Sequence, residues 1–283
     1  MYYLYLIGRF IAIILPRKTL YCLAILLSRL RFYFSKKDRR IVIANLMPMI
    51  ADKTLASSYA KKVFENFALY LADFLSFSKM DRNFLKQYVR ISGLDNLDKA
   101  QKEQGVIALT AHIGNYEMGG GVIASLGYDF YALALPHVDK RINAFFNQQR
   151  GCFGVKVIAT GNGLKTCFRV LSDRKIVAFV GDKDFTAGKR KAVKICGKEV
   201  FLPRGPALFA LKTNSLIVPC FFIRENRYYY HFIFEPPIAP TDNNRPKTVR
   251  EIMEQYSEIL EKYIRQYPEQ WYIFERYWPS MDN

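Results

Sequence analysis

The run of residues 111–117, Ala-His-Ile-Gly-Asn-Tyr-Glu, combines side chains that could move a proton. His112 follows an apolar segment, residues 106–110, that predicts a buried strand, and Glu117 precedes small and apolar residues that predict a helix. Histidine can accept a proton near neutral pH, and a nearby carboxylate can fix its tautomer and stabilise the imidazolium. We therefore expect His112 to act as a general base held by Glu117, with Gly114 allowing a tight turn between them.

Two interpretations of this run are open on spacing alone. In the first, His112 and Glu117 are catalytic, because open α/β sheets place their chemistry at the carboxyl ends of strands. In the second, His112 is a structural histidine, and Glu117 is an acid at a helix N-terminus, where the helix dipole favours it. The rest of the chain has to decide between them, because short motifs also occur by chance.

A second group of charged residues follows another apolar segment, residues 176–180, which also predicts a strand. Asp182 and Asp184 come directly after it and form an Asp-x-Asp pattern. Taken alone, this pattern is typical either of a divalent-metal site in a nucleotide-sugar transferase or of a polar loop.

Arg150 lies near the end of a segment, residues 139–153, that predicts a helix after Leu135 and Pro136. A guanidinium in a cleft would bind a phosphate or a developing oxyanion through its planar fork of donors. The alternative is a surface arginine at a helix C-terminus, where the dipole also favours positive charge.

Short apolar segments alternate with helical ones over most of the chain, which predicts an α/β sheet covered by helices. Residues 1–90 have a helical pattern, and residues 192–201 suggest a short hairpin turning at Gly197. The expected strands are residues 106–110, 130–135, 155–159, 176–180, 216–223 and 229–234. The expected helices after residue 90 are residues 115–126, 139–153, 163–174, 206–213 and 248–267.

The composition favours a negatively charged partner. Of the 283 residues, 51% are apolar, which supplies a sizeable core, and 42 Lys and Arg against 25 Asp and Glu give a formal charge of +17. Such a charge favours nucleic acid or anionic lipid headgroups. The sequence contains no zinc-finger or RNA-recognition signature, so nucleic acid is not an expected partner. The five cysteines are scattered without a Cys-x-x-Cys pair, as in a reduced protein facing the cytosol.

The first 35 residues predict an anchor on a membrane surface. Two apolar runs, residues 2–15 and 20–27, are each shorter than the ~20 residues that a membrane span requires. A polybasic flank with Asp38 as its single acid follows them, and consists of Arg29, Arg31, Lys36, Lys37, Arg39 and Arg40. Apolar helices with such a flank suggest a peripheral or monotopic anchor. A buried helical hairpin is the alternative, and both can hold at once.

From about Arg39 onward, the sequence resembles the lipid A biosynthesis acyltransferases, which add secondary acyl chains to the lipopolysaccharide anchor. His-x-x-x-x-Glu after a strand, here His112 to Glu117, resembles the motif of the wider glycerolipid acyltransferase superfamily. The form His-Ile-Gly-Asn-Tyr-Glu is most similar to the lipid A enzymes. Further similar segments follow in the same order, namely Pro136 with Arg150, Asp182-Lys183-Asp184-Phe185, Phe201 to Ala207, Val218-Pro219, and Pro268 to Tyr272 with Arg276.

This resemblance implies a mixed, mostly parallel sheet and a membrane-associated O-acyltransferase, with an acyltransferase domain over residues 36–283 after the anchor of residues 1–35. It implies catalytic roles for His112 and Glu117. The substrate-binding positions that it implies are Asn115, Arg150, Asp182, Asp184 and Arg204. It implies no metal and no cofactor. An acceptor hydroxyl would attack the thioester of acyl carrier protein or acyl-CoA directly.

The implied acceptor is an anionic lipid A precursor or a similar glycolipid, at the cytoplasmic face of the inner (plasma) membrane. The sequence departs from the family at Leu135, where an arginine is usual, and in a shorter, more basic central region around residues 189–191. These departures leave the acceptor open, and a phosphatidylinositol mannoside or a lysophospholipid is the nearest alternative. Two other classes are a non-enzymatic basic protein that binds membrane or nucleic acid, and a metal-dependent glycosyltransferase that uses Asp182 and Asp184.

Overall fold

The computed structural model describes residues 1–160, 163–184, 192–243 and 245–279. Its helices, with the 3-10 turns marked η, are α1 (Tyr2–Ile14), α2 (Arg17–Phe34), α3 (Lys36–Leu46), α4 (Lys53–Leu75), η1 (Phe77–Lys79), α5 (Arg82–Tyr88), α6 (Leu94–Glu103), α7 (Tyr116–Ser125), α8 (Lys140–Gly151), α9 (Gly163–Ser172), α10 (Gly205–Thr213), α11 (Val249–Gln266) and η2 (Pro268–Gln270). Its strands are β1 (Val89–Ser92), β2 (Val106–Thr110), β3 (Phe130–Ala134), β4 (Lys156–Ala159), β5 (Ile176–Val180), β6 (Ala192–Ile195), β7 (Lys198–Phe201), β8 (Leu216–Arg224), β9 (Tyr230–Phe234), β10 (Thr241–Asp242) and β11 (Arg245–Pro246).

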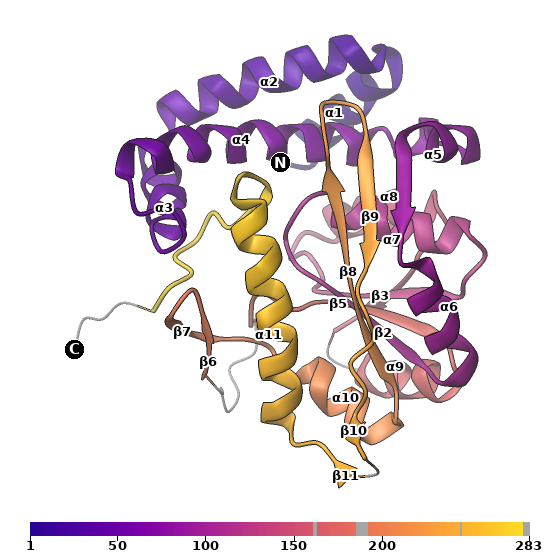
Figure 1. Cartoon of the computed structure of the whole chain (residues 1–283). Helices are drawn as coiled ribbons and strands as arrows, with labels where there is room; N and C mark the ends of the chain where they lie inside the picture. Colours follow the sequence, from indigo (N-terminus) through magenta and orange to yellow (C-terminus); the bar gives the residue numbers. More distant parts are fainter. Residues whose placement is uncertain (161–162, 185–191, 244, 280–283) are drawn as a thin grey trace.

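The central sheet is mixed and mostly parallel, as the family resemblance implies (Figure 1). Its strands follow the order β1-β9-β8-β2-β5-β3-β4, in which the β8–β9 pair is antiparallel and the other described pairs are parallel. β2 lies between β8 and β5, with Thr110 opposite Val180. Each of the six strands expected from the sequence is present within one residue of its predicted ends.

The expected hairpin is present as β6 and β7 and turns at Gly197, whose φ of +73° suits glycine. β1 corrects the expectation of a helical pattern up to residue 90, because Val89 and Arg90 lie in this strand, which pairs with β9. The basic run at residues 189–191 lies outside the described residues.

The sheet separates two apolar cores, because successive side chains of a strand point to opposite faces. Ile107 and Leu109 of β2 pack with residues of α9, α10 and α11. Val106 and Ala108, their neighbours in the strand, pack with residues of α6, α7 and α8. Every residue of β8 is buried, as expected of a central strand that is covered on both faces.

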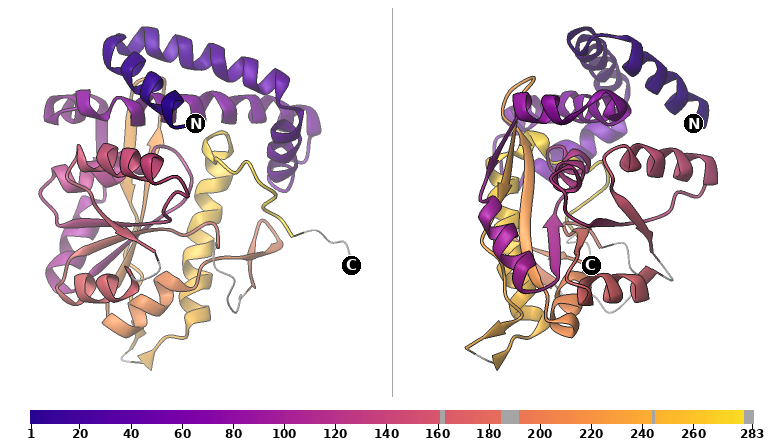
Figure 2. Two further views of the ribbon diagram at one scale, coloured as in Figure 1. Left: turned by 180° about the vertical axis from the view of Figure 1, so that it is seen from behind. Right: turned by 90° about the vertical axis from the view of Figure 1, so that its right-hand side faces the viewer.

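The N-terminal helices lie across the carboxyl ends of the parallel strands. In Figure 1, α2 and α4 cross above the end of β8, and the side view in Figure 2 places α1 and α2 outside α4. Ala12 and Leu20 are buried against Leu69 and Ala72 of α4, so the α1–α2 hairpin is partly integrated into the body. Among the described residues, no helix combines the length and apolar character required to cross a membrane.

Candidate active site

His112 and Asp182 meet because they follow neighbouring parallel strands. β2 ends at Thr110 and β5 ends at Val180, and these two residues lie opposite each other in the sheet. His112 and Asp182 each lie two residues beyond these strand ends. His112 Nδ1 lies 2.8 Å from Asp182 Oδ1, and the backbone N–H of His112 donates to Asp182 Oδ2 at 3.1 Å. The indole N–H of Trp271 donates to the same Oδ2 at 3.0 Å. Both carboxylate oxygens are therefore held by protein donors.

Burial and charge act in opposite directions on this pair. Burial alone would lower the pKa of His112, but the charge and hydrogen bond of Asp182 outweigh it and raise that pKa above its ordinary value of 6.5. Burial alone would raise the pKa of the fully buried Asp182, but His112 and the Trp271 donor keep it below its ordinary value. The arrangement is that of a histidine whose tautomer and orientation are set by a carboxylate.

Glu117, which we expected to hold His112, is bonded to Arg150. The two side chains form a bidentate ion pair, with Arg150 Nε 2.9 Å from Glu117 Oε2 and Arg150 Nη2 2.6 Å from Glu117 Oε1. Their side chains are only 13% and 10% exposed. Burial would lower the pKa of Arg150, but the charge of Glu117 raises it. The carboxylate at Nδ1 of His112 is thus Asp182, and Glu117 acts on the imidazole through its charge, which raises the pKa of His112.

The turn between His112 and α7 is tightly built. Gly114 has a φ of +61°, and a Cβ at this position would lie 2.1 Å from the carbonyl oxygen of Phe222, so the expected need for glycine is confirmed. Asn115 caps α7 by accepting the N–H of Met118 at 3.2 Å, and its side chain is buried. Glu117 consequently lies in the first turn of α7, where the helix dipole favours its charge.

Aromatic side chains form one wall beside the histidine. The ring of Tyr116 packs edge-on against His112 with centroids 5.4 Å apart, and Tyr70 of α4 donates a hydrogen bond to the Tyr116 hydroxyl at 3.1 Å. Sequence reasoning missed Tyr70 and Trp271 as parts of the site. Trp271 lies in the Pro-Glu-Gln-Trp-Tyr segment, which resembles the family. Its contact with Asp182 could not be predicted, because the two residues lie far apart in the sequence.

The family model for bacterial lipid A biosynthesis acyltransferases matches residues 1–280 of this chain. The chain belongs to that family. Membership in it makes the protein an acyltransferase for a lipid A-like acceptor. A search among curated proteins finds no match.

The remaining residues that the family resemblance implied lie toward α11. The charge of Asp184 raises the pKa of Tyr256 in addition to the effect of burial, so this carboxylate lies near α11. The Tyr256 hydroxyl donates to the carbonyl oxygen of Pro203 at 2.7 Å. Because Arg204 follows Pro203 in the chain, its backbone lies beside the same tyrosine. The structure thus brings His112 to Asp182 and Glu117 to Arg150, and it places Asp184 and Arg204 near Tyr256.

The Asp-x-Asp pattern belongs, through Asp182, to the histidine pair. Within residues 1–160, 163–184, 192–243 and 245–279, no group of three or more His, Cys, Asp or Glu side chains is arranged to hold a metal ion. The five cysteines are free thiols, and burial raises the pKa of Cys167, Cys196 and Cys220.

Proposed function

We propose that His112 is the general base of an O-acyl transfer in this lipid A acyltransferase family member. The Nδ1–H of a neutral imidazole would donate to Asp182, which leaves Nε2 as the basic nitrogen. Nε2 takes the proton of an acceptor hydroxyl while the hydroxyl oxygen attacks the carbonyl carbon of an acyl thioester. The C–S bond then breaks, and the thiolate receives the proton from the imidazolium. The observation that carries this proposal is the His112–Asp182 pair at the ends of β2 and β5.

The Glu117–Arg150 pair is proposed to bind the anionic part of a substrate. The bidentate contact with Glu117 fixes the plane of the Arg150 guanidinium and neutralises part of its charge. A guanidinium fixed in this way can still offer an N–H donor to a phosphate or to the oxyanion of the tetrahedral intermediate. Asp184 and Arg204 are proposed as further substrate positions on the family resemblance. Asn115, which the same resemblance implies, is buried and caps α7, so its proposed contribution is to the shape of the loop beside His112.

The α1–α2 hairpin is proposed to bind the membrane surface from the cytoplasmic side. Large apolar side chains on α1 are exposed, with Tyr3 at 67% and Phe10 at 65%, and α2 continues the surface through Leu27 and Leu30. Burial of each Leu- or Phe-sized side chain contributes about 1.5–3 kcal/mol. Between the two helices and α4 lies an apolar cavity of about 270 Å³, which adds apolar surface at the same place.

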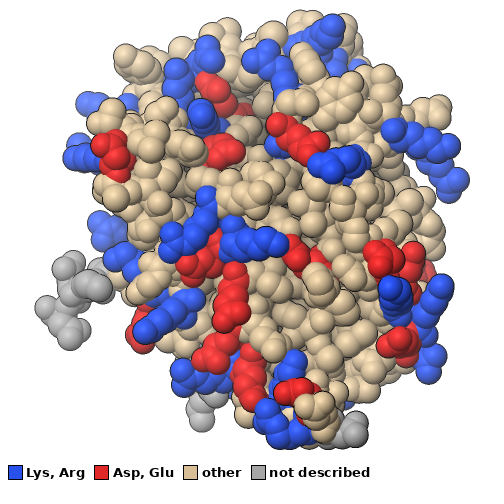
Figure 3. Space-filling view, viewed as in Figure 1, with Lys and Arg blue, Asp and Glu red and all other residues tan. Residues whose placement is uncertain are grey.

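Electrostatic attraction is the smaller part of this proposed membrane binding. Two of the basic residues of the flank already have acidic partners, since Arg29 pairs with Glu65 and Arg31 pairs with Asp38. Over α11, Lys and Arg side chains interleave with Asp and Glu (Figure 3). Each basic residue near an anionic surface contributes about 1 kcal/mol, which is less than a buried apolar side chain.

The acyl transfer is tested with the purified full-length protein in mixed micelles of detergent and a lipid A precursor. Acyl carrier protein thioester and acyl-CoA are supplied in separate reactions, and the acylated lipid is detected by mass spectrometry. We expect a product with at least one donor and none above background with His112→Ala. No product with either donor on any hydroxylated glycolipid or lysophospholipid would refute the proposed activity.

Membrane binding is tested by flotation with vesicles that contain anionic phospholipid. We expect Leu30→Glu to reduce the bound fraction, because a charge enters the proposed contact surface. Leu164→Glu is the matched control, since Leu164 is a similarly exposed leucine on α9, at 52% against 48% for Leu30. Equal flotation of both variants and of the wild type would refute the proposed contact surface.

A further inference from the structure

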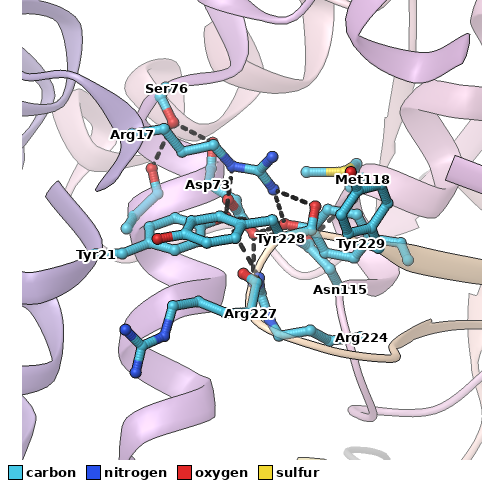
Figure 4. Close-up of polar contacts among 12 residues, drawn as sticks. Arg17, Tyr21, Asp73, Ser76, Asn115, Met118, Arg224, Arg227, Tyr228 and Tyr229 are labelled. Atoms are coloured by element: carbon cyan, nitrogen blue, oxygen red, sulfur yellow. Dashed lines mark hydrogen bonds and ion pairs between the residues drawn. The ribbon is translucent and has the colours of Figure 1, made fainter. Parts of the chain in front are cut away.

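A buried polar cluster lies at the ends of β8 and β9 and centres on Asp73 of α4 (Figure 4). The Asp73 side chain is fully buried. Its Oδ2 accepts a hydrogen bond from Arg224 Nη2 at 2.5 Å and another from the Tyr230 hydroxyl at 2.5 Å. Its Oδ1 accepts a hydrogen bond from the hydroxyl of Tyr21. One carboxylate therefore joins the N-terminal helices α2 and α4 to the consecutive strands β8 and β9, which lie far from them in the sequence.

The same carboxylate reaches the loop that carries His112. Asn115 Nδ2 donates to Asp73 Oδ2 at 3.0 Å, and Asn115 Oδ1 accepts the N–H of Met118 at 3.2 Å. Because both oxygens of Asp73 accept hydrogen bonds, Oδ2 fixes which end of the Asn115 amide faces it. The amide oxygen is thereby turned toward the first turn of α7. Asp73 thus sets the cap of the helix that begins between His112 and Glu117.

Backbone hydrogen bonds also hold this loop to β8, directly and through Gln270. The N–H of Gly114 donates to the carbonyl of Gln270 at 2.9 Å, and the N–H of Asn115 donates to the carbonyl of Phe222 at 2.7 Å. The Gln270 side chain in turn bonds both backbone groups of Arg224, at 2.9 and 2.8 Å. Arg224 consequently contacts Asp73 through its side chain and supports Gln270 through its backbone.

The cluster also fixes the start of α2. Arg17 Nε donates to the Tyr21 hydroxyl at 3.0 Å, and Arg17 Nη2 donates to the Tyr230 hydroxyl at 3.0 Å. The Arg17 guanidinium carbon lies 4.7–5.6 Å from the centroids of five aromatic rings, which belong to Tyr21, Phe84, Tyr88, Tyr228 and Tyr230. The hairpin therefore bonds Asp73 Oδ1 directly through Tyr21 and reaches Oδ2, the oxygen that Asn115 bonds, through Tyr230.

We infer that Asp73 is a positioning residue of the active site, which orients the Asn115 amide and through it the loop from His112 to Glu117. A buried set of charges usually contributes no more stability than well-packed apolar side chains, but it fixes the direction of each hydrogen bond. The loop from His112 to Glu117 requires hydrogen bonds of fixed direction, because small displacements of catalytic groups reduce the rate of reaction strongly. The kinetic part of this inference rests on the proposed function, and the structural part does not.

The structural part is tested by hydrogen exchange in the full-length protein. Asp73→Asn keeps the volume but replaces one of the two acceptor oxygens by an NH2 donor in a cluster of donors, and we expect the amides of residues 114, 115 and 118 to exchange at least about tenfold faster. The matched control is Tyr21→Phe, which removes the hydrogen bond to Oδ1 and keeps all three donors to Oδ2, although Tyr230 and Arg224 lose their contacts with the Tyr21 hydroxyl. We expect exchange at these amides to stay within about threefold of wild type in this control.

The exchanged double variant, Asp73→Asn with Asn115→Asp, returns one carboxylate and one amide to the contact, and we expect it to restore protection. If Asp73→Asn does not fold, Asn115→Ser serves instead, because serine keeps the helix cap and lacks the amide donor. Unchanged exchange at residues 114, 115 and 118 in either folded variant overturns the inference.

The kinetic part compares kcat and KM at a temperature at which every variant is folded. We expect Asp73→Asn to lower kcat about 10- to 100-fold with little change in KM, and the double variant to recover kcat. Tyr21→Phe should lower the thermal midpoint without lowering kcat. A normal kcat in Asp73→Asn refutes the positioning role, whereas an inactive wild type refutes the proposed function and leaves the exchange result to decide the positioning role.

Discussion

Asp182 and Asp73 are both fully buried carboxylates at the carboxyl end of the sheet, yet their partners differ in kind. Asp182 faces His112, whose side chain is 23% exposed and whose charge can change near neutral pH. Asp73 faces Arg224, whose side chain is 5% exposed and whose charge is permanent. The first pair can take part in proton transfer, whereas the second pair can only hold elements in place.

This difference shows that burial of a carboxylate does not by itself identify a catalytic site. Both aspartates lie close to the loop of residues 112–117, since Asp182 binds the backbone and side chain of His112 and Asp73 binds Asn115. What separates them is whether the partner can lose its proton in the working pH range. Variants of the two partners should therefore affect different quantities.

The largest expected effect is on activity. His112→Ala removes the proposed general base and should lower acyl transfer by at least about 10²–10⁴-fold. The thermal midpoint should fall less than the activity, because the indole of Trp271 and the backbone of residue 112 still donate to Asp182 Oδ2, although Oδ1 loses its partner. Product formation by mass spectrometry and thermal denaturation by circular dichroism measure the two quantities. Retention of more than a few per cent of activity in folded protein would contradict the assignment.

The next effect is on stability. Arg224→Met leaves Asp73 buried without its cationic partner, which should cost about 3–5 kcal/mol. For a domain of this size, such a loss lowers the thermal midpoint by roughly 10 °C. Thermal denaturation of the wild type and the variant measures it. A midpoint within about 2 °C of wild type would show that the cluster does not depend on this ion pair.

The smallest effect is expected from a surface ion pair, which serves as the control for Arg224. In α11, Arg265 Nε lies 2.6 Å from Glu261 Oε1, and the Arg265 side chain is 47% exposed. Solvent screens such a pair, so Arg265→Ala should change stability by no more than about 0.5 kcal/mol. The same thermal measurement applies. A loss as large as that of Arg224→Met would mean that burial is not what distinguishes the two arginines.

Much of the fold could be predicted from the sequence because its central strands are short, apolar and separated by helical segments. β2 and β5 have their predicted ends. β1 could not be predicted, because its four residues are mostly half-buried and its pairing with β9 joins segments about 140 residues apart. Patterns along the chain do not contain such long-range pairings.

The composition of the site was predictable, but its pairing was not. His112, Glu117, Arg150 and Asp182 were recognised from motifs, each in its own segment. The order of the strands decides which carboxylate reaches the imidazole, and β5 lies next to β2 although three helices and two strands separate them in the chain. Asp73 and Arg224 were missed, because they lie 151 residues apart with no motif around either, and the contact of Asn115 with Asp73 was missed with them.

The most direct test of the His112 assignment is the pH dependence of kcat/KM in the wild type and in Asp182→Asn. A general base must be neutral, so the rate rises as the pH increases through the pKa of His112. Asp182 raises this pKa above 6.5, so the acid limb of the wild type should have its midpoint above 6.5. Asp182→Asn removes the main raising influence and leaves burial, which lowers the pKa, so the midpoint should move to lower pH while the rate falls. An acid limb that stays in place in Asp182→Asn would contradict the claim that His112, held by Asp182, is the base.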